Sequence, residues 1–349
     1  MHKIIVAGCG GMSNAWIDIA KNRNDCEIVG LVDLNIDTAN KQKETHQLSA
    51  NTYANLATAL EKEDANLVFD VTIPEAHFDT VTTALKAGCH VFGEKPMSDS
   101  LKNAEKMVEC AEQTKKEYFV MQNRRYIPGI YALRNFLHSQ KLGVIGQVSA
   151  NFQLNPHFGG FRDEMDSPLI ADMAIHTFDA ARFITGKNAV SVYCHEFNPP
   201  WSWYKGDANA VCIFEMEDGS VFDYRGSWCA NGIHTSWESE WRVACTKGAA
   251  FWDGNDQLYY EENDLSTFVT SSMSDEEKAA FIHNITPLTM DHTGHEACVM
   301  EMFDALKNGT RPQTDCRDNI HSIRMVYQAI ESTRAKKVIK VNLPAIISS

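Results

Sequence analysis

The stretch KIIVAGCGGMS, residues 3–13, places a short apolar run directly before a cluster of glycines. The apolar run predicts a buried strand, and the residues from 12 to 21 have the spacing of a helix. Further apolar runs that predict strands follow at 27–33, 66–72, 90–95 and 118–123. Helical patterns separate these runs, which indicates a parallel sheet covered by helices on both faces. We predict an α/β Rossmann domain over residues 1–123.

The glycines of this stretch have the spacing of a dinucleotide-binding turn. Gly8 and Gly10 fit the first two glycines of G-x-G-x-x-G: one forms the tight turn, and the other lets the backbone approach a pyrophosphate. Ser13 replaces the third glycine, and its small side chain still permits close packing of helix and strand. Gly11 and Met12 lie between them and are expected to contact the cofactor. A glycine turn alone is also typical of sheets that bind no nucleotide.

An acidic residue at the end of the second predicted strand strengthens the nucleotide prediction. Asp33 lies about 20 residues beyond Ser13, where a carboxylate accepts hydrogen bonds from the ribose hydroxyls and repels a 2′-phosphate. No arginine follows Asp33 immediately, in the stretch DLNID (33–37). We therefore predict binding of NAD in preference to NADP, with Asp33 and Leu34 near the ribose.

The chain changes character after residue 123. Longer runs typical of strands occur at 147–154, 189–197, 209–228, 239–254 and 256–262, and helical patterns at about 168–185, 294–308 and 318–335. Asp218 and Gly219 predict a hairpin turn between two of the strands. Strand runs with segregated helices predict an α+β domain over 124–349 with a large, mainly antiparallel open sheet. We expect this domain to bind substrate and to mediate oligomerisation.

Composition and charge exclude several classes of partner. The 349 residues are 44% hydrophobic and 22% charged, which is typical of globular proteins. A net charge of −14, without a run of Lys or Arg, argues against nucleic acid or a membrane surface as the main partner. The ten cysteines are dispersed without a C-x-x-C pair, as expected of reduced thiols. Because no apolar run approaches the ~18 residues of a membrane span, we expect a cytoplasmic protein.

The stretch GEKPMS, residues 93–98, ends the fourth predicted strand with a lysine held before a proline. Residues at the carboxyl ends of parallel strands face a dinucleotide bound across the sheet. Lys95 is therefore expected beside the nicotinamide, where its ammonium bonds a substrate oxygen and helps to move a proton. The alternative is an ordinary surface ion pair between Lys95 and Glu94.

The predicted helix at 168–185 supplies a second candidate for proton transfer. Asp172 and His176 are four residues apart, so on a helix they share a face, and Asp179 continues that face. A carboxylate beside an imidazole fixes its tautomer and raises its basicity, as a general base requires. Such a pair on a helix is also common as a purely structural contact.

These residues together resemble those of the Gfo/Idh/MocA oxidoreductases, a family that includes glucose–fructose oxidoreductase and inositol dehydrogenase. The resemblance covers nearly the whole chain. It rests on the glycine turn, on Asp33 and on the segments TIPEAH (72–77), GEKP (93–96), NRRYIPG (123–129), DMAIHTFD (172–179) and GTRPQTDCRDNIHSIRMVYQAIEST (309–333).

The resemblance implies roles for individual residues. Lys95 corresponds to the catalytic lysine of the family, and Asp172 and His176 to its carboxylate and histidine. The contacts on the nicotinamide side correspond to Thr72, Ile73, Pro74, His77 and Glu94. Two residues depart from the family pattern: Glu75 replaces a common asparagine, and Ala174 replaces a common glycine. Both departures bear on cofactor orientation or pocket width, and neither removes a catalytic group.

The implied reaction is hydride transfer between a secondary alcohol of a sugar, inositol or related polyol and C4 of the nicotinamide. His176 would take the hydroxyl proton, oriented by Asp172, while Lys95 polarises the oxygen. Two alternatives stay open: a redox-assisted glycosidase or epimerase with tightly bound NAD, and a non-catalytic NAD-binding sensor. Relatives pair through the C-terminal sheet, so we expect a homodimer or homotetramer.

Candidates for substrate contact are polar residues near the domain junction and before the helix of Asp172. They are Arg125, Tyr126, His157 and Arg162, in addition to Lys95, Asp172 and His176. Tryptophan faces in the second half, such as those of Trp201 and Trp237, would suit stacking on a sugar ring, but for any one of them we favour a role in sheet packing or a subunit interface. His292 and His295 are three residues apart, but no third ligand accompanies them, and we predict no metal site.

Overall fold

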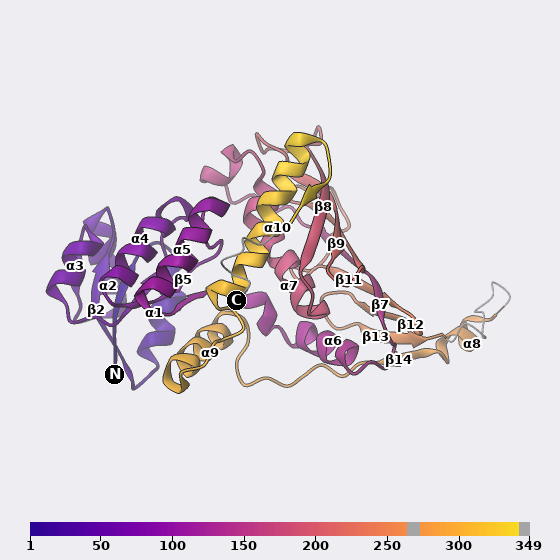
Figure 1. Ribbon diagram of the computed structural model, residues 1–349, viewed down its shortest axis with the longest axis horizontal. Helices are drawn as coiled ribbons and strands as arrows, with labels where there is room; N and C mark the ends of the chain where they lie inside the picture. Colours follow the sequence, from indigo (N-terminus) through magenta and orange to yellow (C-terminus); the bar gives the residue numbers. More distant parts are fainter. Residues whose placement is uncertain (264–272, 342–349) are drawn as a thin grey trace. The chain divides into compact units, whose positions relative to one another are not determined.

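The computed structural model describes residues 1–263 and 273–341, which form two compact units. The first comprises 1–123 and 294–323, and the described part of the second comprises 124–263, 273–293 and 324–341 (Figure 1). The sequence expectation of one boundary after residue 123 differs from this grouping in the segment 294–323. The division into two domains at residue 123 stays a prediction, because compact units defined by contacts do not show which segments fold independently.

The first unit contains a six-stranded parallel sheet in the order β3-β2-β1-β4-β5-β6. Its strands are β1 (His2–Ala7), β2 (Cys26–Val32), β3 (Asn51–Tyr53), β4 (Leu67–Asp70), β5 (His90–Gly93) and β6 (Tyr118–Val120). Ile4, Ile5 and Val6 are fully buried on consecutive positions, because helices cover both faces of the sheet. The predicted Rossmann fold is confirmed.

The helices of this unit alternate with its strands, as the indigo and purple ribbon of Figure 1 shows. They are α1 (Ser13–Lys21), α2 (Ile36–His46), α3 (Leu56–Lys62), α4 (Pro74–Lys86) and α5 (Leu101–Thr114). Helix α9 (Gly294–Asn308), from a later part of the chain, also belongs to this unit. Strand β1 has β2 on one side and β4 on the other, so the order in which successive strands are added to the sheet reverses at β1. In open sheets of this type, ligands bind at the carboxyl ends of the strands next to such a switch point.

The second unit is built on a nine-stranded sheet in the order β14-β13-β12-β11-β7-β10-β9-β8-β15. The strands are β7 (Ile145–Gln153), β8 (Ala189–Phe197), β9 (Asn209–Met216), β10 (Val221–Ser227), β11 (Glu240–Cys245), β12 (Gly248–Trp252), β13 (Leu258–Glu262), β14 (Ile282–Asn284) and β15 (Ile339–Lys340). Every neighbouring pair is antiparallel except β7 and β10. The predicted large, mainly antiparallel open sheet is therefore confirmed. Gly219, at φ +83°, turns the hairpin between β9 and β10 as expected.

Helices pack on one face of this sheet. They include α6 (Pro128–His138), α7 (Ile175–Thr185) and part of α10 (Cys316–Ala335); shorter elements are η1 (Asn123–Tyr126), η2 (Gly160–Glu164), η3 (Leu169–Ala174) and α8 (Asp275–Ala279). Phe178 of α7 meets the rings of Phe214, Phe222 and Tyr224 edge-on, at 4.9–6.1 Å between centroids. Burial alternates along β8 and β9, so these strands have one buried and one open face.

No helix within 1–263 and 273–341 combines the length and the apolar character needed to cross a membrane.

Candidate functional site

The turn after β1 accepts only glycine at its first position. Gly8 has φ +87°, and a Cβ atom there would lie 2.4 Å from the carbonyl oxygen of Val71. By contrast, added Cβ atoms at Gly10 and Gly11 would meet nothing within 4 Å among the described residues. The Ser13 hydroxyl donates to the Gly10 carbonyl at 2.7 Å, so serine closes the turn in place of the third glycine. The turn therefore exposes open backbone, which fits the approach of a pyrophosphate.

Asp33 lies at the end of β2 and contacts this turn directly. Its Oδ2 accepts from the backbone N–H of Cys9 and its Oδ1 from that of Asn35, both at 2.9 Å. Each carboxylate oxygen has a second lone pair, so both oxygens can also accept from ribose hydroxyls. Leu34 is almost fully exposed and Met12 partly so.

Gln42 of α2 also supports the turn, and the sequence analysis missed it. Its Nε2 lies 3.3 Å from the Cys9 carbonyl oxygen and 3.4 Å from that of Gly10. Position 42 lies in a polar helix with no motif, so the sequence contains no signal for this contact.

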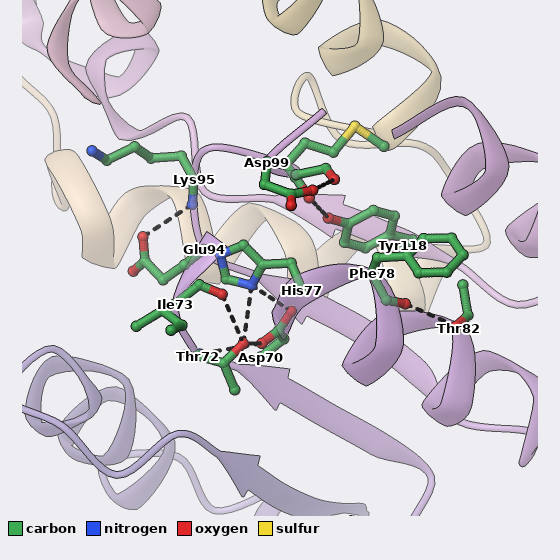
Figure 2. A network of polar contacts seen from close by, with 12 residues as sticks. Asp70, Thr72, Ile73, His77, Phe78, Thr82, Glu94, Lys95, Asp99 and Tyr118 are labelled. Carbon is green, nitrogen blue, oxygen red and sulfur yellow. Dashed lines mark hydrogen bonds and ion pairs between the residues drawn. The ribbon is translucent and has the colours of Figure 1, made fainter. Parts of the chain in front are cut away.

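A buried polar network connects the ends of β4 and α4 (Figure 2). His77 Nδ1 lies 2.8 Å from Oδ2 of Asp70, and Thr72 donates its hydroxyl to Oδ1 of Asp70 at 2.6 Å. Burial lowers the pKa of His77, but the charges of Asp70, Glu94 and Glu75 outweigh burial, so the net pKa is raised. His77 is only 1% exposed, so the network orients Thr72 from inside the unit. Asp70 was not among the residues that the sequence analysis selected.

Glu94 and Lys95 follow β5 at the same edge of the sheet. Glu94 is buried, and its Oε1 accepts from the indole N–H of Trp16 at 2.8 Å. Its Oε2 accepts from the backbone N–H of Lys95 at 3.1 Å, and a cis peptide bond joins Lys95 to Pro96. Figure 2 shows the Lys95 side chain extending away from the network of Asp70. Glu94 is thus fixed through Trp16 and the backbone.

The remaining residues expected near the nicotinamide begin α4. Pro74 is the first residue of the helix, where its missing N–H leaves no bond unmade. Ile73 precedes it and is 60% exposed, so its side chain is accessible at this edge of the sheet.

In the second unit, Asp172 lies in the π-helical turn η3 just before α7. Arg162 of η2 donates its Nε–H to Oδ2 of Asp172 at 2.8 Å. The guanidinium of Arg162 also lies over the rings of Phe161 and Phe158, at 4.7 and 5.6 Å from the centroids. Arg162, predicted as a substrate contact, therefore anchors the predicted catalytic carboxylate. The two residues lie on different elements, and the sequence did not indicate their pairing.

His176, one helical turn after Asp172, lines a small, open hollow of the second unit. The other residues that line it are Arg124, Ile130, Thr177, Ala180, Trp237, Glu238 and Trp241. Arg124 donates from Nη1 to the carbonyl oxygen of Trp237 at 3.0 Å and to Oε1 of Glu238. Glu238 lies 114 residues from Arg124, and no sequence motif indicated this contact.

The other predicted substrate residues occupy different environments. Arg125 is buried and forms a bidentate ion pair with Asp179. Its Nε donates to Oδ2 and its Nη2 to Oδ1, each at 2.7 Å. Tyr126 is buried as well. His157 is half exposed: its Nε2 lies 3.0 Å from Oδ2 of Asp163, and its ring stacks on Trp203.

Across the described ranges, no group of three or more His, Cys, Asp or Glu side chains is arranged to hold a metal ion. His295 Nδ1 lies 3.3 Å from Nδ2 of Asn123 within the first unit.

Comparisons with known proteins agree with this fold in both halves of the chain. Residues 2–122 match the model of the Gfo/Idh/MocA oxidoreductase family, NAD-binding Rossmann fold, and residues 130–251 match the model of the GFO/IDH/MocA C-terminal domain. An uncharacterized protein of Sinorhizobium fredii, y4oX, is 26% identical over 97% of this chain and 96% of its own length.

Two further similarities come from better-described proteins. Inositol 2-dehydrogenase/D-chiro-inositol 3-dehydrogenase of Lacticaseibacillus casei is 30% identical, and the match spans about half of both proteins, 54% of this chain and 55% of the relative. A crystal structure of an oxidoreductase from Agrobacterium radiobacter, in complex with NAD+, L-tartaric acid and magnesium, has a TM-score of 0.83 at 18% identity. That similarity covers 97% of this chain and 98% of the other, and it concerns the fold.

The glycine turn, the six-stranded parallel sheet and the nine-stranded open sheet agree with the two matching models, which together account for most of the sequence. The chain belongs to the Gfo/Idh/MocA family of NAD(P)-dependent oxidoreductases.

Proposed function

We propose that the protein transfers hydride between a secondary alcohol of a sugar, inositol or related polyol and a nicotinamide cofactor. The observation that supports this most directly is the environment of His176. It lines a hollow whose other walls include indole rings and an Arg–Glu pair, while Asp172 is anchored by Arg162 one turn earlier. Such a mixture of aromatic and polar walls suits a hydroxylated ring.

The cofactor is NAD in this proposal, and bound NAD supplies the hydride acceptor or donor. Asp33 supports this choice, because its carboxylate would accept bonds from ribose hydroxyls and repel the 2′-phosphate of NADP. The residues proposed to hold NAD, directly or by orienting a neighbour, are Gly8, Gly10, Gly11, Met12, Asp33, Leu34, Thr72, Ile73, Pro74, His77, Glu94 and Lys95. His77 is too deeply buried for direct contact and would act by orienting Thr72.

Three side chains handle the proton and the reacting oxygen. His176 takes the proton of the substrate hydroxyl at a ring nitrogen, and the Asp172 carboxylate stabilises the imidazolium that results. Lys95 donates a hydrogen bond to the reacting oxygen. Arg162 holds Asp172 in place through the 2.8 Å bond and limits the carboxylate to few orientations.

Substrate contacts beyond these three are also part of the proposal. His157 is half exposed and is proposed to bond a hydroxyl, as is the partly exposed Arg162. Arg125 and Tyr126 are buried, so we assign them a supporting role in the second unit rather than direct contact with the substrate. The name of the inositol dehydrogenase relative supports a polyol as substrate.

The protein is further proposed to act in the cytoplasm as a homodimer or homotetramer that pairs through the C-terminal sheet. The open face of β8 and β9 supports this assembly. Its half-exposed apolar side chains are Val190, Tyr193, Phe197, Val211 and Ile213.

The test is absorbance at 340 nm with purified protein, NAD and a panel of sugars, inositols and glycosides, with products separated by chromatography. Growth of NADH with one stereochemical subset is expected. Product without NADH would replace the dehydrogenase with a redox-assisted glycosidase or epimerase that retains its cofactor. No change in either readout, with NAD binding measured by calorimetry, would favour a sensor.

A further inference from the structure

The hollow of His176 contains a charged pair whose hydrogen-bonding capacity is only partly used. Arg124 directs Nη1 to Glu238 and to the backbone of Trp237. Its Nε is buried, and within the described residues it has no hydrogen-bond partner. A buried charged donor without an acceptor carries the full cost of lost hydration. An oxygen of a bound ligand would remove this cost.

The carboxylate of Glu238 has a hydrogen-bond acceptor that the described part of the chain leaves unused. Its Oε1 accepts from Arg124, and among the described residues its Oε2 has no partner. The backbone of Glu238 is fixed at both ends, since its N–H donates to Ser236 at 3.0 Å and its carbonyl accepts from Trp241 at 2.7 Å. Within the ranges that the structure describes, the Arg124–Glu238 pair therefore has an unused donor at Nε of Arg124 and an unused acceptor at Oε2 of Glu238, and the Glu238 backbone is held in place.

Trp237 provides an apolar wall next to this pair. It is 44% exposed, and its ring is held nearly perpendicular to the buried Trp228, with centroids 5.7 Å apart. The ring centroid of Phe158 lies 6.4 Å from that of Trp237. Held in this way, the indole can cover the C–H face of a ring while its hydroxyls reach polar groups.

We propose that Arg124, Glu238 and Trp237 select the substrate by recognising two of its non-reacting hydroxyls. One hydroxyl donates to Oε2 of Glu238, a second accepts from Nε of Arg124, and the C–H face of the ring packs on Trp237. This inference rests on the proposed function, in which His176 meets the reacting hydroxyl of the same molecule.

The charge of the pair restricts the substrate class further. Glu238 already neutralises Arg124, so a carboxylate or phosphate of a substrate would meet the Glu238 carboxylate without a spare cation from this pair. Like charges in a partly desolvated site repel strongly. The pair therefore selects an uncharged polyhydroxy compound over its uronate or phosphorylated counterpart.

The test compares Glu238→Gln with the matched control Glu240→Gln, two residues along the chain and exposed. Both variants and the wild type are assayed with NAD on the neutral polyol that the 340 nm panel identifies, on its monodeoxy analogues and on its uronate. Glu238→Gln is expected to lower kcat/KM for the parent by roughly 10- to 100-fold, the effect of one charged hydrogen bond. The variant should lose most of the wild type's discrimination against one deoxy analogue. Its kcat/KM for the uronate, relative to that for the parent polyol, should rise. Glu240→Gln should match the wild type in both respects.

Two results would overturn the inference: kcat/KM of Glu238→Gln within threefold of the wild type, or a wild-type preference for the uronate. Binding of the panel compounds, measured by calorimetry in the presence of NAD, shows whether the recognition site is wrong or only the proposed reaction. Polyol binding that weakens in Glu238→Gln, without NADH or product in any assay, would retain the recognition site and reject the reaction. Equal binding by both proteins, or no binding of any polyol to the wild type, would reject the site.

Discussion

Replacing Arg125 by methionine tests whether this residue supports the second unit or contacts substrate. In the structure its Nε and Nη2 each lie 2.7 Å from an oxygen of Asp179, and both side chains are buried. Methionine fills a similar volume but carries no charge. The Asp179 carboxylate would then remain in the interior without its principal countercharge.

The expected cost follows from this geometry. Removing one partner of a buried ion pair typically costs about 3–5 kcal/mol. Arg182 Nη1 remains 3.6 Å from Oδ1 of Asp179 and compensates part of the charge, so we expect the lower end, about 3 kcal/mol. Each kcal/mol shifts the melting temperature of a unit of roughly 200 residues by about 2–4 °C, which gives a decrease of about 6–12 °C.

The measurement is thermal unfolding followed by circular dichroism for the wild type, Arg125→Met, Asp179→Asn and the double variant. Asparagine keeps an acceptor for Arg182 and removes the charge. Because each single change removes one charge of the Arg125–Asp179 pair and leaves the other buried, the double variant should be more stable than the sum of the single effects predicts, by about 2 kcal/mol.

Two results would refute this reasoning. One is a loss below about 1 kcal/mol for Arg125→Met, and the other is additivity of the two single effects. If Arg125→Met kept its melting temperature but lost affinity for the substrate, Arg125 would be the substrate contact that the sequence suggested.

Three further predictions concern catalysis, cofactor binding and pH. Lys95→Ala should leave folding and NAD binding nearly intact but lower turnover by about 10²–10⁴-fold, measured as NADH formation beside calorimetric NAD binding; normal turnover would refute the site. Gly8→Ala should weaken NAD binding by at least about tenfold, because its Cβ would lie 2.4 Å from the Val71 carbonyl at a positive φ; unchanged calorimetric affinity would contradict this. Burial raises the pKa of Glu196 to about 7, so wild-type stability should fall as pH rises from about 4.5 through 7. Glu196→Gln should therefore be more stable than the wild type by about 2–3 kcal/mol at pH 8 and not at pH 5, and a pH-independent difference in melting temperature would be inconsistent with it.

The prediction of the first unit depended on signals that are local in the chain. Apolar runs of strand length, and a glycine turn followed by an acid at the end of the next strand, can be recognised in short segments of the sequence. They predicted five of the six parallel strands, and the structure confirms them. The short strand β3 and the helix α3 were missed, because seven helical residues and three strand residues carry little periodic signal.

Helix α6 shows how tertiary contacts decide what a local pattern leaves open. Its sequence begins with Pro128 and Gly129, a pair typical of turns, and the sequence analysis assigned no helix there. In the structure, Pro128 occupies the first helical position, which suits its fixed φ. A side chain at position 129 would lie 2.4 Å from the ring of Trp252, so glycine permits the helix to approach strand β12.

The sequence by itself determined the family, the order of the parallel strands along the chain and the residue types available for proton transfer. Only the tertiary structure paired Arg162 with Asp172, Asp70 with His77 and Arg124 with Glu238. The physical reason is that a strand or a glycine turn is specified by neighbouring residues. A contact between side chains many residues apart depends instead on how whole elements pack, and no short segment encodes that.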